Sequence, residues 1–156
     1  MSFAGAGRAW ILSVLSCMGV TAVWMTVSGV AKGRLDHIWH NTIDLSLAFG
    51  AVYALTAILV LLPAFAVLTM VSGRFSTPIV AAAVGAALGP LALVVFVLIF
   101  RETGGPQTVS EWLRYWATHL MDTAIGSFPF VIAGAVFGAS WARSANAAAA
   151  LRRASI

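Results

Sequence analysis

Charged residues are scarce in this chain of 156 residues, and their scarcity excludes the common classes of soluble protein. Only 9% of the residues are Asp, Glu, Lys or Arg, whereas 61% are hydrophobic. Soluble domains carry roughly 25% charged and about 45–50% apolar residues. A disordered chain would be polar and highly charged. The composition therefore indicates an integral membrane protein, and the length suits one transmembrane domain covering residues 1–156.

Cysteine and lysine are almost absent as well. Cys17 is the only cysteine, so no disulfide forms within the chain and chemistry that requires paired thiols is excluded. Because Cys17 lies inside an apolar run, we expect it to be a buried structural residue. Lys32 is the only lysine beside eight arginines. Together with the abundant alanine, this bias indicates a GC-rich bacterial genome, and hence the bacterial cytoplasmic (inner) membrane.

Charge is missing altogether from four long runs of the sequence. These runs are Ala9–Ala31, Leu45–Gly73, Phe75–Phe100 and Thr123–Ala142. Each reaches the length of about 20 residues that a helix needs to cross the hydrocarbon core. The first run is too long for a signal-peptide core, so we expect it to be retained. We therefore predict an all-α, multi-pass fold: a bundle of four transmembrane helices at approximately 9–31, 45–72, 77–100 and 123–142.

Local signals place the ends and bends of these helices. Gly73 can end the second helix, Thr77 can cap the third, and Pro78 suits the first helical position. The short link predicts an antiparallel hairpin of helices two and three. Helix two is longer than a bilayer requires, so we expect it to tilt or project. Prolines inside the runs predict kinks in helices two, three and four, at Pro63, Pro90 and Pro129.

Small residues recur at intervals of four in the third and fourth runs. The candidate helix-packing residues are Ala81, Gly85, Gly89, Gly126, Gly134 and Gly138. Small side chains on one stripe let helix backbones approach closely, because packing drives helix association in lipid. We expect them to pack the bundle together. A homo-oligomer or a docking face for another membrane protein would use the same pattern.

Basic residues set the expected orientation. With both termini in the cytoplasm, the inner side would hold Arg8, Arg74, Arg143, Arg152 and Arg153, and the outer side would hold Lys32, Arg34, Arg101 and Arg114. Candidate anchors at the membrane interface are the tryptophans Trp10, Trp39, Trp112, Trp116 and Trp141. The scattered positive charge suits membrane topology better than nucleic-acid binding.

The polar residues concentrate in two segments, 35–44 and 109–122. Each segment sorts its polar residues onto one helical face and its apolar residues onto the other. We predict two short amphipathic helices on the outer face, which lie in the interface or run directly into the next spanning helix. Thr108 followed by Glu111 fits a capping box at the start of the second segment.

These two faces hold the candidate metal ligands of the chain. They are Asp36, His40, Asp44, Glu111, His119 and Asp122. Carboxylates and imidazoles of this kind bind Zn²⁺, Mn²⁺ or Fe²⁺. No known metal signature is present, and any solvated helix face shows the same spacing. We therefore favour a solvated face and keep a divalent metal, or a partner, as the alternative occupant.

Residue types that are missing from the apolar runs narrow the range of functions. Every histidine lies outside the apolar runs, which disfavours a core haem and an intramembrane hydrolase. No ionisable residue lies at membrane depth, which weakens transport. No catalytic residue is identified, no cofactor is predicted and any cofactor-binding residue is unknown, so an enzyme is not favoured. The leading hypothesis is a non-enzymatic accessory, assembly or stabilising subunit of a larger membrane complex. The alternatives are an outer-face metal or small-ligand binding protein and a small transporter or channel component.

Overall fold

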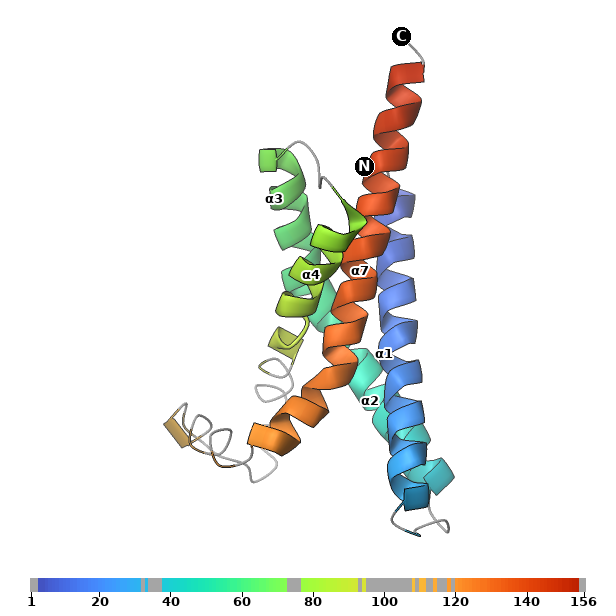
Figure 1. The fold of residues 1–156 in the computed structure, drawn as a ribbon, viewed down its shortest axis with the longest axis vertical. Helices are drawn as coiled ribbons and strands as arrows, with labels where there is room; N and C mark the ends of the chain where they lie inside the picture. Colours follow the sequence, from blue (N-terminus) through green and yellow to red (C-terminus); the bar gives the residue numbers. More distant parts are fainter. Residues whose placement is uncertain are drawn as a thin grey trace.

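The chain folds into helices throughout the part that the structure describes. The computed structural model describes residues 3–31, 33, 38–72, 77–92, 94, 108, 110–111, 114, 118 and 120–154. Its helices are α1 (Phe3–Ala31), α2 (Ile38–Thr56), the π-helical segment η1 (Ala57–Leu61), α3 (Leu62–Ser72), α4 (Pro78–Leu88) and α7 (Leu120–Ala154) (Figure 1). The described residues contain no strand, which confirms the predicted all-α class.

Two helical stretches among the described residues are long and apolar enough to cross a membrane. One is Ala4–Ala31 in α1, and the other is Thr42–Val71, which runs through α2, η1 and α3. The apolar helix Pro78–Leu88 is shorter. From Ile38 onward, the amphipathic segment 35–44 forms the first turns of α2, which continues into the long apolar stretch. This is the second of the two arrangements expected for that segment.

The start of α4 follows from its local sequence. Thr77 has extended backbone angles and its hydroxyl accepts a hydrogen bond from the Val80 amide at 3.3 Å. Pro78 occupies the first turn, where its missing N–H costs nothing because that amide would have no helical acceptor. The predicted cap at Thr77 and the predicted position of Pro78 are thus confirmed.

The prolines act in three different ways. Pro63 follows η1, where the Leu62 amide donates to the Ala57 carbonyl five residues back. The wider π turn accommodates a ring that would otherwise clash with the preceding turn. Pro90 lies in a turn with Gly89 directly after α4 ends at Leu88, and Leu91 and Ala92 are helical again, so Pro90 interrupts the helix where the kink was predicted. Pro129 lies inside α7, whose N-terminal part bends away from the rest (Figure 1).

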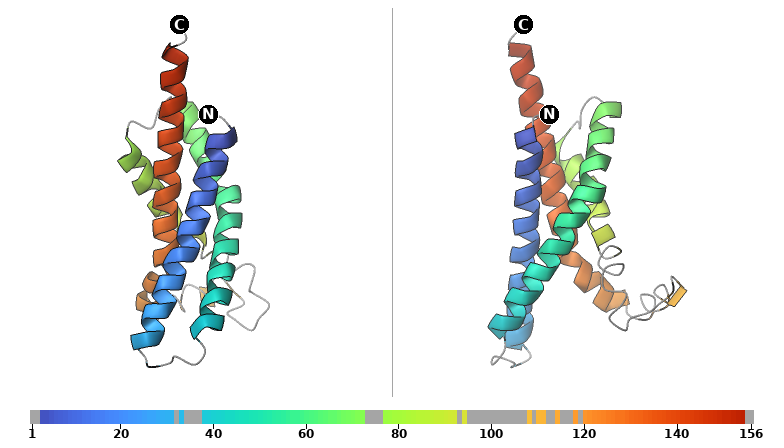
Figure 2. Two further views of the ribbon diagram at one scale, coloured as in Figure 1. Left: turned by 90° about the vertical axis from the view of Figure 1, so that its right-hand side faces the viewer. Right: turned by 180° about the vertical axis from the view of Figure 1, so that it is seen from behind.

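Helix α7 occupies the centre of the packing. It contacts α4 on one side and α1 on the other, and α1 in turn packs on α2 (Figure 2). Helix α4 makes its main contacts with α7 although α3 precedes it in the sequence. The described ends of the chain, Phe3 in α1 and Ala154 in α7, lie at the same end of the molecule (Figure 1).

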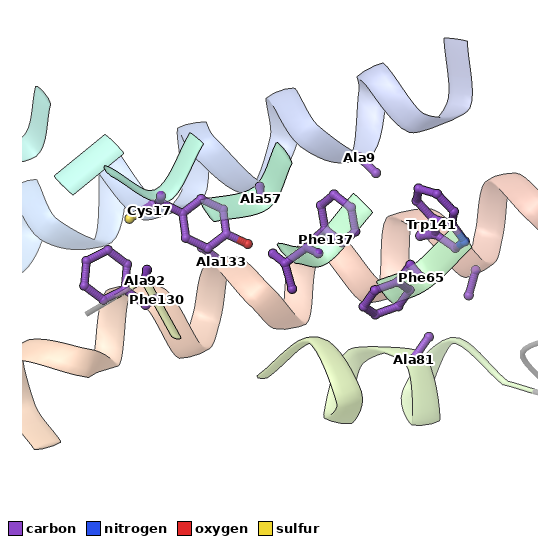
Figure 3. Packing of buried hydrophobic residues seen from close by; sticks show 13 residues of the cluster. Ala9, Cys17, Ala57, Phe65, Ala81, Ala92, Phe130, Ala133, Phe137 and Trp141 are labelled. Atoms are coloured by element: carbon purple, nitrogen blue, oxygen red, sulfur yellow. The ribbon is translucent and has the colours of Figure 1, made fainter. Parts of the chain in front are cut away.

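Aromatic rings fill the space between α7 and the helical stretch from α2 to α3. Phe130 stacks on Phe49 with ring centroids 5.1 Å apart. Nearer the C-terminal end of α7, Phe65 meets Phe137 edge-on with centroids 5.3 Å apart. Trp141 joins this second group, and Figure 3 shows it beside Phe65 and Phe137. Offset and edge-on aromatic pairs each contribute about 0.5–1.5 kcal/mol beyond their buried area.

Glycines bring the backbones of α4 and α7 into direct contact. A Cβ atom at Gly134 would overlap the carbonyl oxygen of Gly85, and a Cβ at Gly138 would overlap the carbonyl oxygen of Ala81. A Cβ at Gly89 would likewise meet the Phe130 carbonyl. Gly126 differs, because a Cβ there meets nothing within 4 Å among the described residues, so this glycine does not belong to the close contact.

This geometry predicts opposite effects of alanine at two glycines of the same helix. We expect Gly134→Ala to destabilise the protein by roughly 1–3 kcal/mol, since α4 must move away from α7. We expect Gly126→Ala to be neutral, or stabilising by up to about 1 kcal/mol through its higher helix propensity. Unfolding in mixed detergent micelles measures both, and equal effects of the two variants would contradict the assigned contact.

Candidate functional site

The six candidate metal ligands are only partly described by the structure. Asp44 lies in α2 with its side chain exposed, and Glu111 is also exposed. His40 and Asp122 lie in α2 and α7, but only their backbones are described. Asp36 and His119 lie outside the described residues. Among the residues described, no three His, Cys, Asp or Glu side chains gather where they could hold a metal ion. The metal hypothesis therefore stays a prediction.

Glu111 has a structural role at the start of the second polar segment. The Thr108 amide donates to Glu111 Oε2 at 3.1 Å, and the Glu111 amide donates to Thr108 Oγ1 at 3.2 Å. This reciprocal pair is the capping box expected from the sequence, and it satisfies two amides that a helix start leaves without helical acceptors. The capping box is confirmed, and it occupies an oxygen of Glu111 that a metal would otherwise use.

Polar side chains inside the bundle are hydroxyls tied to their own helices. Thr21 donates to the Cys17 carbonyl at 2.8 Å, and Thr56 donates to the Val52 carbonyl at 2.9 Å. Both threonines are buried. Such bonds to the preceding turn hide the hydroxyl from the apolar surroundings. Cys17 itself is buried with a free thiol, which confirms the expected structural cysteine.

Two buried hydroxyls are exceptions to this pattern. Ser46 Oγ and Tyr53 Oη, both on α2, have no hydrogen-bond partner among the described residues. The sequence analysis missed them, although Ser46 and Tyr53 stand on the same face of the helix as Thr42.

Two of the predicted interfacial tryptophans donate hydrogen bonds inside the protein. Trp10 Nε1 donates to the Ala54 carbonyl at 3.1 Å, which links α1 to α2. Trp141 Nε1 donates to Thr69 Oγ1 at 3.0 Å, which links α7 to α3. Trp141 is only 5% exposed. Its contacts are with the protein core, so Trp141 packs α7 against α3, and its role as an interfacial anchor stays a prediction. The side chains of Trp39, Trp112 and Trp116 lie outside the described residues.

An open apolar groove separates α1 from α7. It encloses about 350 Å³, and it lies where the N-terminal part of α7 diverges from α1 (Figure 1). Its lining residues are Gly19, Val20, Val23, Trp24, Val27, Phe128 and Ile132. Trp24 is 41% exposed and Phe128 is 52% exposed. Ligand sites of this size normally add a few polar groups that orient the ligand. Apart from the indole of Trp24, the side chains that line this groove carry no polar group, so the groove suits hydrocarbon.

Comparison with known proteins adds no relative. The sequence matches no protein-family model and no curated protein, and the fold matches no solved structure. The functional interpretation therefore uses the residues and geometry described above.

The hydrogen bond between Trp141 and Thr69 can be measured directly. We expect Trp141→Phe and Thr69→Val each to destabilise the protein. We expect the double variant to reveal a coupling of about 0.5–1.7 kcal/mol, the range found for hydrogen bonds between helices in membranes. Unfolding in detergent of the wild type and the three variants provides the cycle. A coupling near zero would show that the bond does not stabilise the packing of α7 on α3.

Proposed function

We propose that this protein is a small integral membrane protein with four membrane-crossing helices, and that it serves as a non-enzymatic accessory subunit of a larger membrane complex. Its termini face the cytoplasm in this proposal. The observation that carries the proposal is the apolar exterior of the described helices. They direct large aliphatic side chains outward, although aromatic and aliphatic side chains also fill the core beside a few buried hydroxyls.

The outward-facing surface is extensively apolar. Val23 of α1 is 66% exposed, Leu59 of η1 is 60% exposed and Ile79 of α4 is 79% exposed. Further exposed large apolar residues occur on every helix named above. Soluble monomers rarely expose contiguous apolar surface of more than a few hundred Å². Lipid removes the cost of this exposure, because hydrocarbon chains solvate these side chains as well as a protein core would.

Charge supports the orientation. In the proposed topology, the sequence segments on the side of both termini carry five basic residues, and the segments on the outer side carry four. The positive-inside rule places the end with more arginine in the cytoplasm. Four crossings agree with two termini at one end.

The polar groups favour a subunit over a channel or an enzyme. Thr21 and Thr56 are buried, and each donates its hydroxyl proton to a carbonyl of its own helix. Asp44 and Glu111 are exposed, and the ionisable side chains that are buried among the described residues are the thiol of Cys17 and the phenol of Tyr53. What the helices do provide is outward-facing apolar surface for other membrane components. An accessory role in the assembly or stability of a complex uses that property.

The crossing pattern predicts which introduced cysteines are accessible from outside intact cells. In a Cys17→Ala background, we expect a membrane-impermeant maleimide to label Ser110→Cys. Ala4→Cys and Ala150→Cys should react only after permeabilisation. All three positions are exposed in the structure, so differences report the side of the membrane. Labelling of the terminal positions in intact cells would refute the proposed orientation, and labelling of all three would refute the four crossings.

The accessory role predicts a stable partner. We expect purification from the native membrane in mild detergent to recover the protein with one or more other membrane proteins in fixed stoichiometry. Loss of this chain should lower the amount or stability of that complex, measured by native electrophoresis. Recovery of the protein alone, with an activity of its own, would contradict the proposal.

A further inference from the structure

Helix α7 extends past the rest of the molecule. It runs for 35 residues to Ala154, while its apolar run ends at Ala142. The twelve residues from Arg143 to Ala154 add about 18 Å of helix at 1.5 Å per residue. Figures 1 and 2 show this extension standing beyond the first turn of α1 and the last turn of α3 in every view.

The extension remains helical because of its composition. Six of its twelve residues are alanine, the residue with the highest helix propensity. Arg153 lies in the last turn, where a positive charge interacts favourably with the helix dipole. The dipole explains an arginine at this place. It does not explain Leu151, which is 73% exposed beside the arginines.

The extension carries charge of one sign only. Residues 123–156 contain Arg143, Arg152 and Arg153 and no Asp or Glu. Arg143 and Arg153 are exposed, and so are Ala147 and Ala150 between them. The result is a slim helix with a small-residue surface, an exposed leucine and arginines at both ends. Its charge is complementary to an acidic surface, which lipid headgroups or a protein could supply.

The distance of Arg153 from the membrane distinguishes between lipid headgroups and a protein as the source of the acidic surface. If the hydrocarbon core ends near Ala142, Arg143 lies in the headgroup layer, which is roughly 5–8 Å thick. Arg153 follows ten residues later, about 15 Å further along the axis. Along the helix axis, the Arg153 backbone therefore lies about 7–10 Å beyond the headgroups, roughly one Debye length at physiological salt, where attraction to anionic lipid is weakened. The tip of α7 is better placed for a protein than for the membrane surface.

We propose that the projecting end of α7 is the docking element for a partner protein, whose acidic surface on the cytoplasmic side pairs with Arg152 and Arg153 and accommodates Leu151. This inference rests on the membrane location proposed above, and it specifies where the complex is held together. Arginine is suited to this role because its planar guanidinium binds carboxylates in a bidentate manner.

The test introduces a photoreactive p-benzoylphenylalanine at Ala150, an exposed position that leaves Leu151 in place. We expect ultraviolet irradiation of living cells to produce one adduct with a protein. The variant R152E/R153E should lower its yield about tenfold, whereas R152K/R153K should retain most of it. The pair R8E/R143E is the matched control. It reverses the same amount of charge near the headgroups and should leave the adduct unchanged.

The partner's own charge decides the outcome. Replacing acidic residues of the crosslinked peptide by arginine should restore the adduct with R152E/R153E. Absence of a protein adduct, an adduct with lipid, equal yields in R152E/R153E and wild type, or failure of the charge swap would each overturn the proposal. Carbonate extraction shows that every variant is still membrane-inserted, which separates this failure from a failure of the membrane assignment. If R152E/R153E fails to insert, R152Q/R153Q carries the same comparison.

Discussion

The direct backbone contact between α4 and α7 is the constraint on which the rest of the packing depends. Gly85 and Gly134 leave no space for a side chain between the two helices. In the proposed membrane location, lipid provides no hydrophobic force between helices, so close approach and dispersion must supply the attraction. With α4 seated on one face of α7, the opposite face receives α1, and the aromatic side chains of α7 meet Phe49 and Phe65.

A second constraint is the pairing of every backbone polar group within the helices. Each proline removes one donor, and the chain compensates at each site. The π turn before Pro63 and the end of α4 before Gly89 and Pro90 are such compensations, and so is the bend of α7 around Pro129. The bend has a consequence for the surface, because the groove between α1 and α7 includes Phe128 and Ile132 on either side of that proline.

The proposed function follows from the distribution of polar and apolar side chains over the helices. The buried threonines bond to their own helices, many large aliphatic side chains face outward, and arginines without acids extend from one end. The described residues thus present extensive outward-facing surfaces. The outward-facing apolar helices and the cationic end of α7 are two such surfaces, one suited to the membrane and the other to a protein partner.

Features that depend on a few neighbouring residues were predictable from the sequence. Thr77 with Pro78 and Thr108 with Glu111 act within three residues, so the caps could be read without knowing the fold. The long uncharged runs likewise predicted helices, because an apolar chain that crosses a membrane must satisfy its amides internally. The four-residue spacing of glycines identified packing stripes in two runs. It could not show that Gly134 contacts Gly85 or that Gly126 lies outside this contact.

Tertiary structure decided whatever depends on residues far apart in the chain. Trp141 is a packing residue because its acceptor, Thr69, lies 72 positions away, and composition alone suggested an interfacial anchor. Ser46 and Tyr53 become buried hydroxyls without partners only once the helices assemble. The sequence by itself determined the helices, their caps and the distribution of charge, since these follow from local hydrogen bonding and from the cost of charge in lipid. Which helix faces meet was decided by the shape fit of side chains from distant segments, which no local pattern encodes.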